Sequence, residues 1–245
     1  MQRNISEKHR GKLTRILDEN LKQNLVGHLF HKADIDIINI EMTKLNRFTT
    51  LPILIDLLER EKLVLIEPTT WDDKNDTLLI ETYKKRAKVD KLFAMCFTHE
   101  AETIHHWKAF ANGNSGCCIE FDRKKLIDVF DSNPQLKHRI VDYPLIKSID
   151  ELSINIADIP FTKRYPYNLE NEYRVFWEGK SEDTVFEIPI SIDSIRLITF
   201  AQQMPESIFH SLKKMLESRY PLLKGKINHS TIYENKEWVK KFEII

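Results

Sequence analysis

The chain has 245 residues, of which 42% are hydrophobic and 30% charged, with 37 basic and 37 acidic side chains. This balance produces no long-range field, so neither nucleic acid nor anionic lipid is an expected partner. No run approaches the roughly 18 apolar residues of a membrane span, and no apolar stretch follows the charged first residues. The three cysteines, Cys96, Cys117 and Cys118, form no CxxC pair and are expected as reduced core residues. A cytoplasmic protein is predicted.

Leucine and isoleucine recur every three or four positions between residues 6 and 30, which predicts one amphipathic helix. We expect residues 1–36 to form a helical appendage that either covers the core or contacts a second copy. Six glycines in the whole chain, and no stretch rich in Pro, Gly or Ser, give no sign of a dividing linker. A single domain is therefore predicted over residues 37–245.

Beyond residue 37, apolar runs and helical spacings alternate without the rhythm of repeated strand–helix–strand units. Strands are predicted at 37–48, 63–66, 92–97, 115–122, 139–143, 171–178, 184–190 and 195–200, and helices at 50–61, 78–90, 104–111, 124–130 and from 205 onward, with a last strand and turn within 226–242. The run 92–97 is apolar on both alternating faces, which is typical of a central strand. The pattern predicts an α+β fold with a mixed, largely antiparallel sheet flanked by helices.

Two of these helices have a defined apolar face. The helix 50–61 is predicted to bury Leu54, Leu57 and Leu58, and the helix from 205 to bury Ile208, Leu212, Met215 and Leu216.

An acidic segment, Thr69 to Asp76, lies between the strand 63–66 and the helix 78–90. Its carboxylates, on Asp72, Asp73 and Asp76, could together hold Mg²⁺ or Mn²⁺, which prefer oxygen ligands. They could instead form turns and cap the helix that follows, which is the commoner role. The chain has no Walker loop, GxGxxG, HExxH, GxSxG or zinc-finger spacing, so the enzyme classes that depend on them are disfavoured.

Three histidines, His99, His105 and His106, follow the predicted central strand. A histidine there could act as a base or as a metal ligand. Spacings of six and one, however, do not place three imidazoles on one face of a helix or strand.

A charged pattern occupies the predicted strand 171–178 and the residues just before it. Period two places Glu170, Glu172 and Arg174 on one face, and the apolar Tyr173, Val175 and Trp177 on the other. Two carboxylates beside a guanidinium form a tunable site for charge stabilisation. The same pattern also suits a solvated ladder of salt bridges between strands, and both interpretations stay open. The basic and aromatic stretch 163–167 directly before it could line a pocket.

Several short motifs, in order, resemble the bacterial proteins grouped as domain of unknown function 2971. They are the loop PTTWDDKND, the segment CFTHEAETIHHWKAFANGNSGCCIEFD, the triplet VDY and the stretch KRYPYNLENEYRVFW. The resemblance covers about residues 38–233. Lys74 stands where a proline is usual in that loop, and Asp76 where a glutamate is commoner.

A further similarity is to the ADP-ribosyltransferase fold, which uses NAD and places a catalytic glutamate on a late strand. This resemblance implies that Glu172 is the catalytic glutamate and Glu170 its partner. It implies that Thr69 or Thr70 supports the nicotinamide, and that Arg47 anchors the dinucleotide. Trp71 and Arg174 complete the candidate cofactor-binding set.

Three functions are carried forward from the sequence. The first is a phage-defence or toxin-like effector with an ADP-ribosyltransferase-like site that uses NAD. The second is a metal-dependent phosphoester hydrolase built on Asp72, Asp73, Asp76 and a histidine such as His105. The third is a non-enzymatic binding or regulatory module that recognises a small molecule or a protein through aromatic residues, for which the candidates are Trp71, Trp107, Tyr165 and Tyr167.

Overall fold

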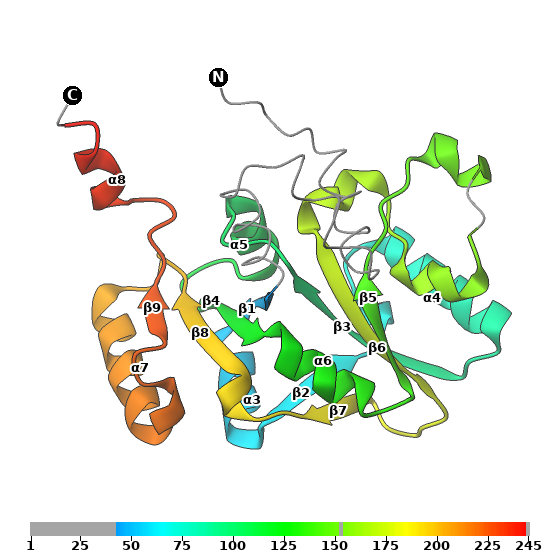
Figure 1. The fold of residues 1–245 in the computed structure, drawn as a ribbon, viewed down its shortest axis with the longest axis horizontal. Coiled ribbons are helices and arrows are strands. Elements are labelled where there is room, and N and C mark those ends of the chain that lie inside the picture. The colour runs from blue at the N-terminus through cyan, green and yellow to red at the C-terminus, as the bar shows by residue number, and fades with distance from the viewer. Residues whose placement is uncertain (1–42, 152–153, 244–245) are drawn as a thin grey trace, which may run out of the picture. The chain divides into compact units, whose positions relative to one another are not determined.

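A computed structural model describes residues 43–151 and 154–243 (Figure 1). The predicted appendage over 1–36, and the first residues of the predicted strand 37–48, lie outside the described residues. None of the described helices is both long and apolar enough to cross a bilayer.

The described residues form one nine-stranded sheet surrounded by helices, which confirms the predicted α+β fold (Figure 1). Its strands are β1 (Lys44–Thr50), β2 (Lys62–Ile66), β3 (Lys91–Thr98), β4 (Gly116–Asp122), β5 (Leu136–Ile140), β6 (Glu172–Gly179), β7 (Val185–Pro189), β8 (Ile195–Phe200) and β9 (Ile227–His229). Its α-helices are α3 (Leu51–Arg60), α4 (Lys74–Ala87), α5 (Ile104–Phe110), α6 (Arg123–Asp131), α7 (Glu206–Arg219) and α8 (Lys236–Lys240).

The sheet is antiparallel except between β8 and β9, and it runs in the order β5-β6-β3-β1-β4-β8-β9. Strand β3 pairs with β6 along its whole length, from Lys91 opposite Gly179 to Thr98 opposite Glu172. Its other edge is shared, because β1 pairs with it only at Thr98 and β2 only at Ala94. The β2 strand then continues the sheet toward β7. The end of β3 therefore lies beside the start of β6.

Alternating side chains give the sheet two covered faces. The larger core lies on one face, where buried side chains from α3, α6 and α7 pack on it. On the other face, α4 and the segment 156–161 form a second apolar cluster, and α5 forms a third. Tyr173, Val175 and Trp177 of β6 belong to the larger core, as their period of two predicted, whereas Phe176 belongs to the second cluster.

Helix α3 shows how local chemistry sets these elements. Pro52 occupies its first turn, where no intrahelical donor is needed, and Glu61 ends it in a left-handed conformation with φ 49°. Leu54, Leu57 and Leu58 are buried, as predicted.

The predicted inner face of α7 is wrong in two positions. Ile208 and Met215 are 48% and 46% exposed, whereas Phe209 and Leu216 are buried and Leu212 is partly buried. The helix packs at one side of the sheet through a narrow stripe centred on Phe209, so only part of the predicted apolar face meets the core.

Glu170 does not lie on the strand on which it was predicted. It ends a 3₁₀-helix, Tyr165–Glu170, and Asn171 separates it from β6 with φ 40°. Asparagine tolerates this left-handed conformation better than most residues, and the turn interrupts the alternation that a continuous strand would impose.

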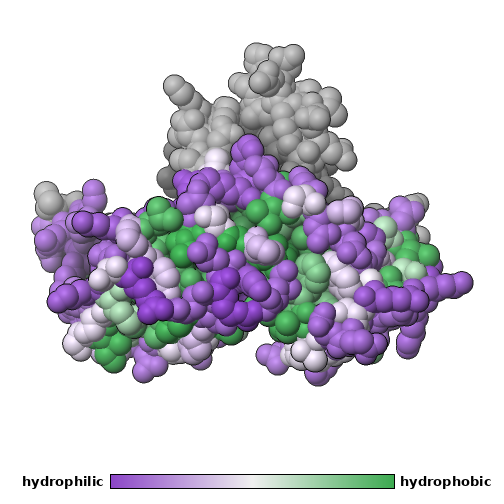
Figure 2. Space-filling view, turned by 90° about the horizontal axis from the view of Figure 1, so that it is seen from below, coloured by the Kyte–Doolittle hydropathy of each residue, from purple (hydrophilic) through white to green (hydrophobic). Residues whose placement is uncertain are grey.

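Apolar side chains also reach the surface. Viewed from below, Figure 2 shows hydrophobic residues among charged and polar ones rather than a purely hydrophilic face. Isolated exposed apolar residues are normal for a folded protein.

Candidate charged site

Arg174 is the centre of a buried charged cluster beneath the second face of the sheet. Its side chain is 0% exposed, and its five N–H donors all have acceptors. Nε and Nη2 donate to the two carboxylate oxygens of Glu172, at 2.6 and 3.1 Å. Nη1 and Nη2 donate to the two carboxylate oxygens of Asp76, at 3.0 and 2.6 Å, and Nη1 also donates to the carbonyl of Pro160 at 2.8 Å.

Three separate parts of the chain build this arrangement. Glu172 and Arg174 share one face of β6 because they are two residues apart on a strand. Asp76 comes from the first turn of α4, and Pro160 from the segment that packs against α4. The ring of Trp71 lies 4.8 Å from the guanidinium carbon of Arg174, which is a cation–π distance.

Lys163 is a second buried cation in the same cluster. Its ammonium lies 2.6 Å from Glu170, 3.6 Å from Glu172 and 3.8 Å from Asp76. The ring of Tyr167 lies 4.8 Å from it. Because one lysine contacts all three carboxylates, Glu170 and Glu172 converge even though Glu170 is not on the strand.

The backbone around Glu170 is held from two elements. Its carbonyl accepts a hydrogen bond of 2.6 Å from the Thr98 hydroxyl at the end of β3. His106 Nε2 lies 3.2 Å from the same carbonyl, and its Nδ1 lies 2.7 Å from the Thr103 hydroxyl. His106 is thus a positioning residue for Glu170, which no sequence spacing had distinguished from His99 or His105.

The two glutamates differ in protonation behaviour. Burial alone would raise the pKa of Glu172, but Arg174 and Lys163 outweigh burial and hold that pKa below its usual value. For Glu170 burial prevails over Lys163, so its pKa is raised. Burial likewise raises the pKa of Asp76. Neighbouring carboxylates whose pKa values move apart are suited to different chemical roles.

Arg47 is a cation in a different setting. It lies on β1, half-buried, and makes no hydrogen bond or ion pair with any described residue. Burial lowers its pKa, and its electrostatic neighbours are the thiols of Cys96 and Cys117. Cys96 lies opposite Arg174 in the β3–β6 pair and interacts electrostatically with Glu172. A guanidinium with no acceptor among residues 43–151 and 154–243 is suited to bind an anionic group.

The threonines of the candidate cofactor set lie apart from the charges. Thr69 and Thr70 are exposed in a 3₁₀ turn, and the hydroxyl of Thr70 donates to the carbonyl of Glu67 at 2.9 Å. From the predicted early segment, Trp71 and Asp76 are the residues with contacts to Arg174.

The carboxylates of the acidic segment do not converge on one point. Asp73 caps α4 by accepting from the backbone N–H of Asn75 at 3.0 Å, which confirms the capping interpretation. Asp76 binds Arg174, and Asp72 is exposed. Within 43–151 and 154–243, no group of three or more His, Cys, Asp or Glu side chains is arranged to hold a metal ion.

Other members of the cluster were not identified from the sequence. Lys163 was expected only to line a pocket, and Pro160 and Tyr143 had no assigned role. The Tyr143 hydroxyl accepts from the backbone N–H of Glu172 at 3.0 Å. These contacts depend on how distant segments fold together, so no local pattern signals them.

No protein-family model, no curated protein and no solved structure matches the chain. The resemblances stated above therefore stay predictions from the sequence motifs.

Proposed function

We propose that the cluster around Lys163 is the core of an ADP-ribosyltransferase-like site that uses NAD, in a phage-defence or toxin-like effector. One observation carries the proposal. Glu170 and Glu172 contact the same lysine, while their pKa values move in opposite directions. Paired carboxylates are the groups that many enzymes use to cleave a glycosidic bond, where an ionised carboxylate stabilises the cationic sugar.

The proposed reaction breaks the bond between ribose and nicotinamide. Nicotinamide leaves with the bonding electron pair, and the ribose becomes cationic before water or an acceptor attacks it. The ionised Glu172 stabilises that positive charge. Glu170 holds a ribose hydroxyl through Oε1, which accepts no hydrogen bond from the described residues, whereas Oε2 is bound to Lys163.

Two further groups support a dinucleotide as the ligand. Arg47 offers a phosphate a guanidinium that has no acceptor among the described residues, and the half-exposed Trp71 offers an aromatic ring beside the cluster. Arg174 takes a different role from cofactor binding, for which it was a candidate from the sequence. Because its donors are saturated by protein acceptors, it fixes Glu172 and Asp76 and does not contact the cofactor.

The test is release of nicotinamide from NAD, and transfer of label from NAD to the proteins of a bacterial lysate. We expect both for the wild-type protein, and a loss of about a hundredfold or more in Glu172→Gln and Glu170→Gln. Glu182→Gln is the matched control, because Glu182 is an exposed glutamate outside the cluster.

Thermal unfolding of every variant separates lost chemistry from lost folding. Glu172 is buried against Arg174, so Glu170→Gln is the more decisive substitution if Glu172→Gln unfolds. Wild-type protein that neither binds nor cleaves NAD, or a folded Glu170→Gln variant with full turnover, would contradict the proposal.

The alternative is a binding module in which the cluster only stabilises the fold. The saturated donors of Arg174 favour it, since a purely structural cluster needs no free group. Of its predicted aromatic contacts, Trp107 is buried and cannot meet a partner at the surface, while Tyr165 is exposed. Absence of NAD binding in calorimetry would favour this second function.

A further inference from the structure

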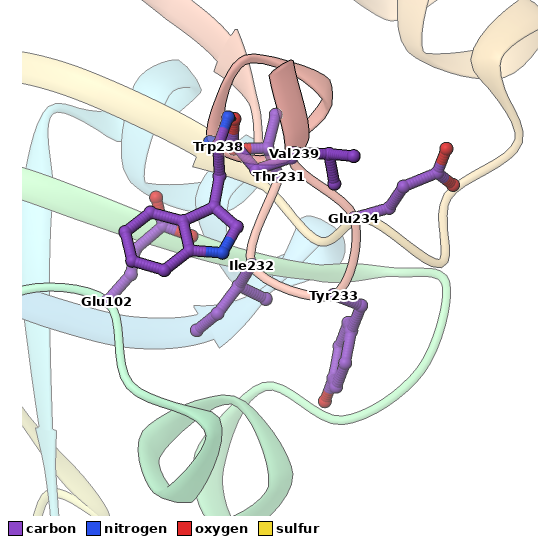
Figure 3. Close-up of a pocket in the computed structure, with 8 residues that line it drawn as sticks. Glu102, Thr231, Ile232, Tyr233, Glu234, Trp238 and Val239 are labelled. Atoms are coloured by element: carbon purple, nitrogen blue, oxygen red, sulfur yellow. Dashed lines mark hydrogen bonds between the residues drawn. The ribbon is translucent and has the colours of Figure 1, made fainter. Parts of the chain in front are cut away.

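The structure has a groove of about 560 Å³ whose lining residues are distant in sequence from the glutamates of the charged site. Glu102, in the loop before α5, forms one side (Figure 3). The other side comes from the segment after β9 and from α8, through Thr231, Ile232, Tyr233, Glu234, Asn235, Trp238 and Val239. The groove is thus lined by two parts of the chain that are distant in sequence.

Glu102 is held in a fixed orientation by the protein. Its Oε2 accepts a hydrogen bond of 3.0 Å from the indole N–H of the buried Trp107, and another from the hydroxyl of the buried Ser230. Both bonds go to the same oxygen. Oε1 accepts no hydrogen bond from the described part of the chain, which leaves one acceptor of a pre-oriented carboxylate for a ligand.

The opposite wall is also ordered by hydrogen bonds. The side-chain oxygen of Gln202 accepts from the backbone N–H groups of Tyr233 and Glu234, at 2.6 and 3.2 Å. The Asn235 side chain donates to the Thr231 hydroxyl at 3.1 Å and caps α8. A wall built in this way needs little reordering on binding.

The charges and the exposed aromatic side chains of the groove indicate which kind of ligand it can bind. Its charged lining residues, Glu102 and Glu234, are both acidic. Trp238 is 66% exposed and Tyr233 45%, and Phe242, next to Trp238, is 58% exposed. Exposed aromatic rings beside carboxylates attract cations whose carbon chain can lie on the rings.

We infer that this groove binds an arginine- or lysine-bearing peptide segment of a partner protein. The cationic head group pairs with Glu102 Oε1, and its aliphatic stem lies along Trp238. A peptide fits better than a free amine, because Tyr233, Trp238 and Phe242 are all exposed and an extended segment can contact several apolar side chains at once. Tryptophan and tyrosine are also the residues that most often dominate peptide and protein interfaces.

The test is fluorescence anisotropy with a labelled peptide of alternating arginine and leucine. A peptide of the same length with glutamate in place of arginine is the charge control, and free arginine amide is the competitor. We expect the basic peptide to bind, binding to weaken as salt rises, and affinity to fall about tenfold or more in Glu102→Gln and in Trp238→Ala.

Glu182→Gln is the matched surface control and should leave peptide affinity unchanged. Release of nicotinamide from NAD should be the same in Glu102→Gln as in the wild type, so the two proposals can fail separately. Equal binding of the acidic peptide, unaltered affinity in Glu102→Gln, or arginine amide competing as well as the peptide would overturn the inference. So would dimerisation that Trp238→Ala abolishes, because the occupant would then be a second copy.

Discussion

The buried side chain of His106 connects helix α5 to the charged site through the backbone of Glu170. The carbonyl of Glu170 can only accept, so Nε2 carries the hydrogen and Nδ1 accepts from the Thr103 hydroxyl. The neutral ring is therefore fully paired. Burial lowers the pKa of His106 and prevails over the hydrogen bond to the Glu170 carbonyl, which acts to raise it. The neighbouring His105 lowers this pKa further, and Glu100 raises it.

This predicts a loss of stability in mild acid. The folded-state pKa lies below the unfolded value of 6.5, so the unfolded chain binds a proton that the folded chain resists. The contribution is present above the unfolded pKa and is lost as pH falls toward the folded pKa. Urea unfolding from about pH 7.5 to about pH 5.5 should show a smaller decrease in unfolding free energy for His106→Gln than for the wild type. An equal decrease in the unfolding free energy of both proteins would show that His106 is not the source of the acid sensitivity.

At the scale of elements, α4 connects the acidic segment to the cluster. Asp73 caps its first turn, and Asp76, three residues later, reaches Arg174. The cap was predictable, because an aspartate before a helix acts on the backbone nearest to it. The partner of Asp76 was not, since Arg174 lies 98 residues away in sequence.

Neighbouring aspartates allow a matched test of this cap. Asp73→Ala should lower the unfolding free energy by about 1 kcal/mol, since it removes the acceptor for the Asn75 N–H. Asp72→Ala removes an exposed carboxylate that caps nothing, so little change is expected. Urea denaturation of both variants measures the difference. Equal losses would show that the capping bond contributes no stability of its own.

At the scale of the whole molecule, the alternation of apolar residues predicted the fold class but not the order of strands. A buried strand has the same apolar pattern whichever strand lies beside it. The sequence pattern therefore could not predict that β1 and β2 share one edge of β3. The candidate site divides in the same way. The pairing of Glu172 with Arg174 was predictable, because they lie two residues apart on a strand. The contacts of Lys163 and Asp76 with them were not, because only the folded chain brings these distant segments together.

Arg174 joins α4, the segment before β6 and β6 itself, so its removal should affect the stability of the entire fold. Arg174→Met leaves Glu172 and Asp76 buried with Lys163 as their remaining cation, and should cost about 3–5 kcal/mol. Arg174→Lys keeps the charge but cannot supply five planar donors, so it should rescue stability only in part.

The matched control is Arg196→Met, because Arg196 is an exposed strand arginine whose ion pair with Glu120 spans 3.5 Å. Its loss should change stability little. Urea denaturation of the three variants gives the comparison. An equally small loss of unfolding free energy in Arg174→Met and Arg196→Met would show that the buried cluster does not stabilise the fold.

The left-handed turn at Asn171 restricts which relatives could share this site. A β-branched residue is strongly disfavoured at φ 40°, so Asn, Gly or Asp should stand between the two glutamates. The lysine lies seven residues before the first glutamate, and the arginine two residues after the second. A sequence pattern with these spacings, and with an aspartate well upstream, would identify distant homologues that overall identity no longer reveals.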